Sequence, residues 1–322
     1  MHEHGLKLDH LTEYTAYPVH MERLNWLVKT IQEQRAHSLD REMRIRDFTQ
    51  KLKVSSDLNN LEVESGREES ENSELEDKAK RSFREGDSIS SQTDSIGNRW
   101  QPMVRILDVG CGTGNITIPL GMIPNSEVMG IDMYQPNIDL VNTRNTLPNV
   151  RVTFSRLSDF DVSTFDFIIF TEVLEHIPGY RDILEDLSKR MKPTAQILVT
   201  IPNGWGPFEW AMQPMYIMRR MGLNGFIGKV KKLLGKKEPY ALNQEIDPHV
   251  NFFTRKQIKN DCEKFGLKLV EFEPAFVMAP IMETYTPFIS LNKIAYYDNK
   301  FAHALPVWLA SGWYYRMRRA RG

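Results

Sequence analysis

The sequence predicts an α/β protein built on a mostly parallel β-sheet. A short apolar run at 104–107 leads directly into a loop with glycine at every second position, and that loop opens a helix. A second apolar run ends in Asp132, about twenty residues past the glycines, where nucleoside-binding α/β folds place a carboxylate. Three more nearly continuous apolar runs follow, as expected for strands that are buried on both faces.

The other elements follow in a regular order. Strands are expected at 128–133, 150–154, 165–170 and 195–203. After an interruption, a helix is predicted from an N-cap at Thr254 to a stop at Gly266. A sixth strand is expected at 267–272, and the last strand at 313–317.

The glycine loop is the most informative part of the chain. Residues 108–114 read DVGCGTG, a G-x-G-x-G spacing that differs from the dinucleotide-binding G-x-G-x-x-G and from a P-loop. Because glycine tolerates positive φ and has no Cβ, a ligand can lie directly against this backbone. The free N–H groups at the start of the following helix attract polar or anionic ligand atoms. The loop therefore predicts a ligand-binding site.

Composition limits the function classes. The formal net charge of −1 over 322 residues gives no global argument for nucleic-acid binding. Cys111 and Cys262 are far apart and lack metal-ligand spacing, which predicts a reducing compartment and no zinc site. Cys111 is expected to be a packing residue. No secretory signal is visible, and no apolar run approaches about 18 residues. We therefore expect a cytoplasmic protein.

With these elements in place, the chain resembles the class I S-adenosylmethionine (SAM)-dependent methyltransferases. Residues 108–114 are similar to the first motif of that family, and residues 172–176 (EVLEH) resemble the signature after its fourth strand. The resemblance is strong over 104–203 and holds in outline over 249–318; it is greatest to ubiquinone-pathway and bacterial surface-glycan-cluster enzymes. It implies a Rossmann-like sheet of seven strands in the order 3-2-1-4-5-7-6, with the last strand antiparallel and helices on both faces.

The expected domain organisation has three parts. Residues 1–45 form an N-terminal helical segment, with apolar residues at helical spacing over 19–36 and a strand-like lead at 42–45. Residues 46–102 are rich in Ser and Glu, and we expect a disordered insertion because they cannot bury enough apolar area. An acidic interaction segment or a phosphorylated segment is the alternative. Residues 103–322 form the methyltransferase domain.

The resemblance implies roles in SAM binding. Asp108 is expected to hold the amino group directly or through water, Asp132 the ribose hydroxyls, and Met133 to lie against adenine. A purely structural role is the alternative for both aspartates. The "GD" pair that many relatives use at the adenine amine is absent, and Ser158 or Asp159 is expected there. The complete expected set is Asp108, Gly110, Cys111, Gly112, Gly114, Asp132, Met133, Ser158, Asp159 and Glu172.

Catalysis can depend mainly on alignment, because the methyl group of a sulfonium is already activated. A base is needed when the acceptor is a hydroxyl, and His176 and His249 are the candidates, with structural roles as the alternative. Glu172, Glu175, His176 and His249 together resemble the metal-binding set of small-RNA 2′-O-methyltransferases, which suits Mg²⁺ or a transition metal. The same motif is common in metal-free small-molecule enzymes, and no RNA-binding module is recognisable. We therefore expect no metal.

Residues 204–248 are the most individual part of the chain. They combine Trp205, Phe208 and Trp210 with a Met-rich stretch and a basic run that ends at Lys237. We expect a helical lid over the substrate pocket, since selectivity in such folds depends on added loops. The basic amphipathic surface over 211–237 could instead contact anionic lipid or a phosphate-bearing substrate, or be an ordinary solvated helix face.

The sequence thus predicts a SAM-dependent methyltransferase that acts on a small or lipid-linked metabolite, at oxygen, with no nucleic-acid partner. Two alternatives stay open. One is a metal-dependent RNA 2′-O-methyltransferase. The other is a non-catalytic SAM-binding interaction protein.

Overall fold

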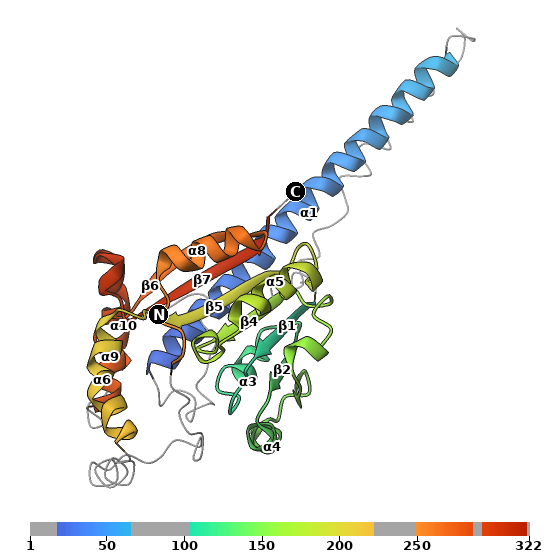
Figure 1. Ribbon diagram of the computed structural model, residues 1–322. Helices are drawn as coiled ribbons and strands as arrows, with labels where there is room; N and C mark the ends of the chain where they lie inside the picture. The colour runs from blue at the N-terminus through green and yellow to red at the C-terminus, as the bar shows by residue number, and fades with distance from the viewer. Residues whose placement is uncertain (1–17, 66–102, 222–248, 286–291, 321–322) are drawn as a thin grey trace. The chain divides into compact units, whose positions relative to one another are not determined.

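The computed structural model describes residues 18–65, 103–221, 249–285 and 292–320. The chain divides into two compact units, of which the first combines residues 1–31 with 103–322 and the second comprises residues 32–102. The first unit contains the sheet and the whole candidate site (Figure 1).

The first unit is organised around a seven-stranded sheet in the order β3-β2-β1-β4-β5-β7-β6. The first five strands pair in parallel, and β7 runs antiparallel to both β5 and β6. This confirms the predicted topology. The strands are β1 (Val104–Val109), β2 (Ser126–Asp132), β3 (Val150–Phe154), β4 (Phe167–Thr171), β5 (Gln196–Pro202), β6 (Leu267–Ala275) and β7 (Gly312–Arg319).

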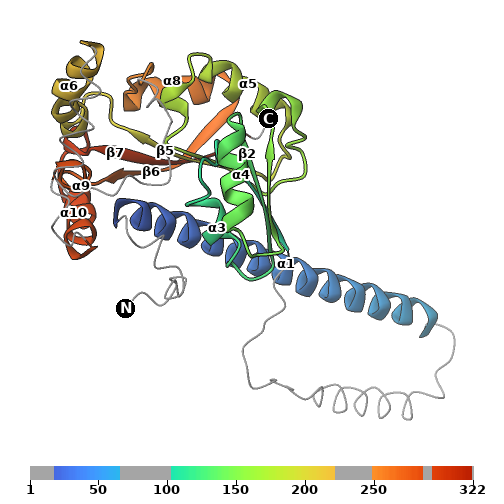
Figure 2. The same ribbon diagram turned by 90° about the horizontal axis from the view of Figure 1, so that it is seen from below.

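Helices cover both faces of this sheet. On one face lie the first turns of α1 with α3 and α4, and on the opposite face lie α5 and α8 (Figure 2). Trp26 of α1 packs on Tyr314 of β7, with ring centroids 4.8 Å apart. The helices are α1 (Pro18–Ser65), α3 (Thr117–Leu120), α4 (Gln135–Arg144), α5 (Tyr180–Arg190), α6 (Pro207–Arg220), α8 (Arg255–Lys264), α9 (Ala279–Tyr285) and α10 (Asn292–Ala304), with short 3-10 turns η3 (Leu157–Asp159), η4 (Leu174–His176) and η5 (Val307–Leu309).

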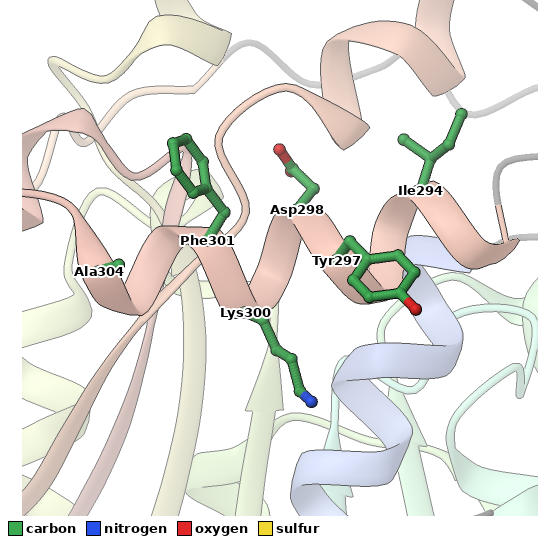
Figure 3. A pocket seen from close by; sticks show the side chains of 6 residues that line it. All are labelled: Ile294, Tyr297, Asp298, Lys300, Phe301 and Ala304. Carbon is green, nitrogen blue, oxygen red and sulfur yellow. The ribbon is translucent and has the colours of Figure 1, made fainter.

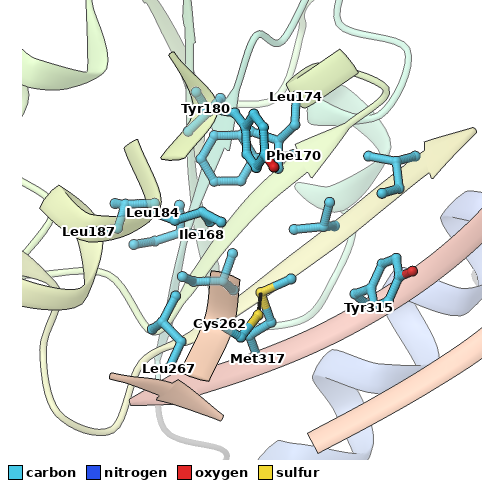
Figure 4. Close-up of a cluster of buried hydrophobic side chains, with 14 of the residues drawn as sticks. Ile168, Phe170, Leu174, Tyr180, Leu184, Leu187, Cys262, Leu267, Tyr315 and Met317 are labelled. Carbon is cyan, nitrogen blue, oxygen red and sulfur yellow. Dashed lines mark hydrogen bonds between the residues drawn. The ribbon is translucent and has the colours of Figure 1, made fainter. Parts of the chain in front are cut away.

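The face under α5 and α8 contains a continuous apolar core (Figure 4). Phe170 of β4, Leu184 of α5 and Cys262 of α8 are fully buried there. The Sγ of Cys262 lies 3.4 Å from the Sδ of Met317 on β7. This core fixes the position of the loops that leave the carboxyl ends of β4 and β5, where the candidate site lies.

The predicted caps of α8 are confirmed. The side chain of Thr254 accepts a hydrogen bond from the Gln257 N–H, so it is the N-cap. Gly266 follows the helix with a φ of 68°, a conformation that favours glycine at a helix end.

The N-terminal prediction needs a correction. The predicted boundary at residue 45 lies inside α1, whose backbone is helical to Ser65, and the strand-like lead at 42–45 is wrong. The reason is local propensity: no glycine or proline occurs between Pro18 and Gly66, and nothing interrupts the helix. The prediction of disorder therefore fails for 46–65, while residues 66–102 lie outside the described residues. The start of the methyltransferase domain near residue 103 stays a prediction.

Candidate active site

The three glycines after β1 share a positive φ but have different surroundings. Gly110, Gly112 and Gly114 have φ values of 71°, 52° and 80°. A Cβ on Gly110 would lie 2.7 Å from Cγ2 of Val173, and one on Gly114 would lie 2.9 Å from Cγ2 of Val141. Among the described residues, a Cβ on Gly112 would have no neighbour closer than the Gly110 oxygen at 4.0 Å. The outer glycines are therefore required by packing, whereas the middle one leaves open space in which a ligand can approach the backbone.

Asp132 at the end of β2 is joined to this loop. Its Oδ2 accepts a hydrogen bond from the Gly112 N–H at 2.8 Å, and its Oδ1 accepts one from the Tyr134 N–H at 2.8 Å. Oδ2 also accepts a longer bond from the Asn137 side chain at 3.4 Å, so Oδ1 is the oxygen that keeps capacity for another donor. Met133 lies beside this carboxylate in sequence and is 63% exposed. The structure thus brings together the two predicted motifs, the glycine loop and the acid of the second strand.

Cys111 is a packing residue, as the sequence predicted. Its side chain is buried, and burial raises the pKa of the thiol, which disfavours the reactive thiolate. It packs against Gly130 of β2, where a Cβ would lie 2.9 Å from the Cys111 Cβ. The sequence analysis missed Gly130. The signal was available, because a glycine inside a strand marks close approach of another group.

Asp108 is held inside the protein. It is 2% exposed, and its Oδ2 accepts a hydrogen bond from the Thr117 hydroxyl at 2.6 Å. Burial raises the pKa of this carboxyl to about 7, the Thr117 hydrogen bond opposes the shift, and Asp132 adds to it. Asp108 therefore connects the end of β1 to the start of α3, which is a structural role. Its role toward SAM stays a prediction.

The raised pKa of Asp108 predicts a pH dependence of stability. Between the ordinary pKa of 3.8 and the folded value of about 7, the folded chain holds a proton that the unfolded chain has released. The contribution of this group to the free energy of unfolding therefore falls as pH rises through that window and is constant above it. Relative to wild type, the free energy of unfolding of Asp108→Asn is expected to rise by roughly 3 kcal/mol between about pH 5 and about pH 8. Urea denaturation of both proteins at both pH values measures this difference. If the free energy of unfolding changed with pH by the same amount in both proteins, the raised pKa of Asp108 would be contradicted.

Two loops that are distant in sequence are tied together at the carboxyl ends of β4 and β5. The backbone oxygen of Glu175 accepts hydrogen bonds from the N–H groups of Val250 and Asn251, at 2.9 and 3.1 Å. The Asn251 side chain donates to the oxygens of Leu174 at 2.8 Å and Ile177 at 2.6 Å. These bonds place His249 beside His176. The sequence analysis missed Asn251, which looked like an ordinary polar residue between apolar ones.

Asn251→Ala is expected to separate the two histidines. The substitution removes two side-chain hydrogen bonds and leaves two carbonyl oxygens without them, which should lower the free energy of unfolding by about 1–3 kcal/mol. Chemical denaturation measures this loss, and methyl transfer by the folded variant should fall with it. Asn149→Ala, at a residue that bonds Gly121 and Ser126 away from these loops, is the matched control for the loss of a half-buried amide. Full activity of Asn251→Ala would show that the loops do not need this link.

Glu172, which directly follows β4, is half-buried. It has a φ of 54°. Its Oε1 accepts from the Thr200 hydroxyl at 3.0 Å, and its Oε2 pairs with Arg23 of α1 at 2.9 Å. Both oxygens are thus engaged by the protein. Whether Glu172 also contacts the cofactor, as predicted, stays a prediction.

Glu175, His176 and His249 form a compact cluster. One possible ligand atom from each lies within 4.8 Å of the others. The rings of His176 and His249 are 5.0 Å apart, edge to face. Glu175 is fully buried, and neither carboxylate oxygen has a hydrogen-bond partner within the described part of the chain. Burial, followed by repulsion from Glu172, raises the pKa of Glu175 well above its usual range.

The cluster has two chemical capacities. An imidazole can take a proton from an acceptor hydroxyl. A carboxylate with two imidazoles is also a donor set that suits a divalent cation. The sequence analysis expected no metal, and that expectation stays a prediction.

A fourth member, Glu209, was missed. It lies in the first turn of α6, is 2% exposed, and its Oε1 is 2.7 Å from Nδ1 of His249. An acid in a first helical turn is ordinary in sequences, so no signal distinguished it. The predicted pair Ser158 and Asp159 lies on η3, where the Ser158 hydroxyl donates to Asp159 Oδ1 at 2.9 Å. Their role at the adenine amine stays a prediction.

A family model and several known proteins match this chain. Residues 56–272 match the family model described as "Methyltransferase domain". The chain is similar to the ubiquinone biosynthesis O-methyltransferase of Rickettsia akari (strain Hartford), at 30% identity over 33% of this chain and 43% of that protein. It is also 30% identical to the human mitochondrial protein of that name, over 31% of this chain and 29% of the human one. The chain thus matches less than half the length of these two relatives.

Among solved structures, the chain resembles a SAM-dependent methyltransferase from Archaeoglobus fulgidus. The TM-score is 0.43 at 18% identity, over 67% of this chain and 86% of the other. Within the described residues, no helix is long and apolar enough to cross a membrane.

Proposed function

Since the chain belongs to the class I SAM-dependent methyltransferases, we propose that it transfers a methyl group from SAM to a hydroxyl of a small metabolite. One observation carries the proposal. The Gly112–Asp132 hydrogen bond creates a cofactor cradle, and Val173, which packs on Gly110 of that cradle, is two residues from Glu175 in the histidine cluster. The similarity to O-methyltransferases supports oxygen as the acceptor atom.

The residues of the cradle fit SAM. The space beside Gly112 accepts a ligand against the backbone, and Asp132 has acceptor capacity for ribose hydroxyls. Met133 offers an uncovered apolar side chain for adenine, and Ser158 or Asp159 would meet its amine. When bound, SAM supplies a methyl group that is activated on a sulfonium. Asp108 would hold the amino group directly or through water.

The histidine cluster supplies the chemistry for the acceptor. A hydroxyl must lose its proton as its oxygen attacks, and a positioned imidazole contributes about 100-fold or more to such steps. Either His176 or His249 would take this proton, because both lie at the loops next to the cradle. Alignment of the acceptor supplies the rest of the rate.

A second candidate follows from the convergence of Glu175, His176 and His249. In it, these three residues would hold a divalent cation, which would supply Lewis-acid activation of the acceptor hydroxyl, as in the RNA 2′-O-methyltransferase alternative. Chelation with EDTA followed by addition of Mg²⁺ or Mn²⁺ separates the two candidates. Activity that survives chelation supports the imidazole base, and activity that returns only with the cation supports the metal.

A lipid-linked acceptor is supported by exposed apolar side chains. On α6, Trp210 and Ile217 are 63% and 57% exposed, and Met221, directly after that helix, is 68% exposed. On α10, Tyr297 and Phe301 are 66% and 57% exposed. Figure 3 shows Phe301 and Tyr297 projecting from α10, where they line a shallow hollow. We therefore keep the proposal of peripheral membrane contact through 211–237, of which 222–237 lie outside the described residues.

Co-sedimentation with vesicles tests this contact. The protein is expected to sediment with vesicles that contain anionic lipid more than with neutral ones, and Trp210→Ser should weaken the association. Equal recovery in the supernatant with both compositions would contradict it. A cytoplasmic location agrees with the two buried free cysteines and stays part of the proposal.

The proposed function is tested by product analysis. The protein is incubated with SAM that carries a ¹³C-methyl group and with a panel of phenolic, alcohol, amine and lipid-linked acceptors. The expected product is an O-methyl ether, identified by mass and by its ¹³C-methyl resonance, together with S-adenosylhomocysteine. Methylation at nitrogen or carbon would contradict the proposal. SAM binding without turnover across the panel would favour the non-catalytic alternative.

A further inference from the structure

The turn that carries Ser158 and Asp159 lies next to the cofactor cradle. The Ser155 N–H donates a hydrogen bond to the Asp132 backbone oxygen at 3.1 Å, so the segment after β3 leaves the sheet beside the acid of the cradle. Ser158 and Asp159, on η3, are both exposed. The two side chains are therefore accessible to a ligand at the end of β3 that adjoins Asp132.

Arg190, the last residue of α5, holds this turn on both sides. Its Nη2 donates to the Leu157 oxygen at 3.0 Å, and its Nη1 donates to the Phe160 oxygen at 2.8 Å. Leu157 and Phe160 directly flank the pair Ser158 and Asp159 in the sequence. A guanidinium presents its donors in one rigid plane, so a single side chain fixes both carbonyl groups.

Asp186, one helical turn earlier, fixes the direction of Arg190. Both Asp186 carboxylate oxygens accept from Arg190 Nε, at 2.8 and 2.9 Å, and Nη2 also bonds Oδ2. The adjacent pair on the same helix, Glu185 and Lys189, has the same i, i+4 spacing, and its lysine side chain is 68% exposed. Exposed pairs of this kind contribute little to stability. Arg190 adds two carbonyl contacts to such a pair, and those contacts act on the turn rather than on the helix.

We propose that Arg190 is a positioning residue, which holds Ser158 and Asp159 where they meet the amine of the SAM adenine. The inference rests on the proposed function, because it needs SAM in the cradle. An amine N–H can donate to a carboxylate oxygen of Asp159 or to the Ser158 hydroxyl. Because Arg190 orders the turn before the ligand binds, the affinity is not reduced by the entropy cost of ordering it. The effect falls on the adenine end of the ligand.

Amide hydrogen exchange, followed by NMR without any ligand, tests whether Arg190 orders the turn. The Phe160 N–H bonds the Leu157 oxygen at 3.3 Å, so its exchange rate reports on the turn. In Arg190→Ala this amide is expected to exchange about tenfold faster than in wild type. Lys189→Ala is the matched control and should leave the rate unchanged. An unchanged rate in a folded Arg190→Ala protein would overturn the inference.

Calorimetric titration tests the consequence for the adenine end. The two ligands are S-adenosylhomocysteine and S-inosylhomocysteine, in which a carbonyl oxygen replaces the amine. Wild type is expected to bind S-adenosylhomocysteine about tenfold more tightly. Arg190→Ala should lose most of this preference, because its affinity falls for the ligand with the amine, and Lys189→Ala should keep it. A loss of affinity by the same factor for both ligands would indicate a merely structural role and overturn the inference.

Removal of the two polar side chains tests whether Arg190 acts through them. A variant that combines Ser158→Ala with Asp159→Ala is expected to bind the two ligands equally. Adding Arg190→Ala to it should then change neither affinity, since substitutions that act through one contact are not additive. A further fall in affinity for S-adenosylhomocysteine would show that Arg190 acts elsewhere and would overturn the inference.

The outcomes separate failure of the inference from failure of the proposed function. If wild type binds neither ligand, the proposed function fails and the inference falls with it. If wild type binds both ligands equally, or if Arg190→Ala keeps the preference for the amine, binding of the cofactor stands and only the inference fails.

Discussion

Replacing Asp132 with alanine is expected to lower the affinity for SAM about 100-fold, or roughly 2.8 kcal/mol. The carboxylate would accept hydrogen bonds from ribose hydroxyls, and bonds to a charged acceptor are worth more than neutral ones. It also accepts the N–H of Gly112, so its removal releases the part of the loop that lies against the ligand. Loss of the ribose contact and loss of the Gly112 contact both weaken the binding of SAM.

Two further variants accompany Asp132→Ala: one retains part of the acceptor group, and the other is a control. Asp132→Asn keeps one acceptor oxygen, and its affinity is expected to lie between those of wild type and the alanine variant. Asp139→Ala removes an exposed acid on α4 whose Oδ1 accepts a hydrogen bond from the Gln135 side chain, and it should bind SAM like wild type. Calorimetric titration measures all four proteins. Wild-type affinity in Asp132→Ala would remove Asp132 from the cofactor site.

Alanine at Gly110 is expected to reduce mainly the stability of the fold, whereas alanine at Gly112 is expected to reduce mainly the affinity for SAM. At Gly110 it meets a strained φ and a contact of 2.7 Å with Val173, which together should lower the free energy of unfolding by roughly 2–5 kcal/mol. At Gly112 it meets only the strained φ, at about 1–2 kcal/mol, but its methyl group occupies the open space. SAM affinity should therefore fall tenfold or more, about 1.4 kcal/mol, at Gly112.

Urea denaturation and calorimetric titration of both variants measure this contrast. The pair is its own control, because both substitutions add one methyl group at a positive φ. A Gly112→Ala protein that binds SAM normally would show that the ligand does not use this space. Equal destabilisation of the two variants would show that the Val173 side chain moves aside at no cost in free energy of unfolding.

The sheet topology could be predicted because its signals are local. Nearly continuous apolar runs marked the buried parallel strands, and the glycines and Asp132 marked the carboxyl ends of β1 and β2. Thr254 and Gly266 marked the ends of α8 through cap chemistry that depends on single residues. The length of α1 was missed because low apolar content was taken as disorder, while helix propensity acts without burial.

The candidate site was predicted only in part, for a different reason. His176 and His249 were recognised by residue type, but their proximity depends on hydrogen bonds from Asn251 to the loop after β4. Glu209 joins them through the close packing of the β5–α6 turn on the segment at 252–253. Such contacts are set by tertiary structure, and no spacing in the sequence encodes them. Asp108 shows the converse, since its motif predicted a ligand contact and the structure adds a buried bond to Thr117.

Binding of SAM by the Gly112–Asp132 cradle is the claim on which the proposed methyl transfer depends, and it is tested by calorimetric titration of the purified wild-type protein. The protein is titrated with SAM and with S-adenosylhomocysteine, and its folded state is verified by circular dichroism. We expect one site with micromolar affinity for each ligand. No heat of binding from either ligand, in a protein that is demonstrably folded, would contradict the claim and with it the proposed methyl transfer.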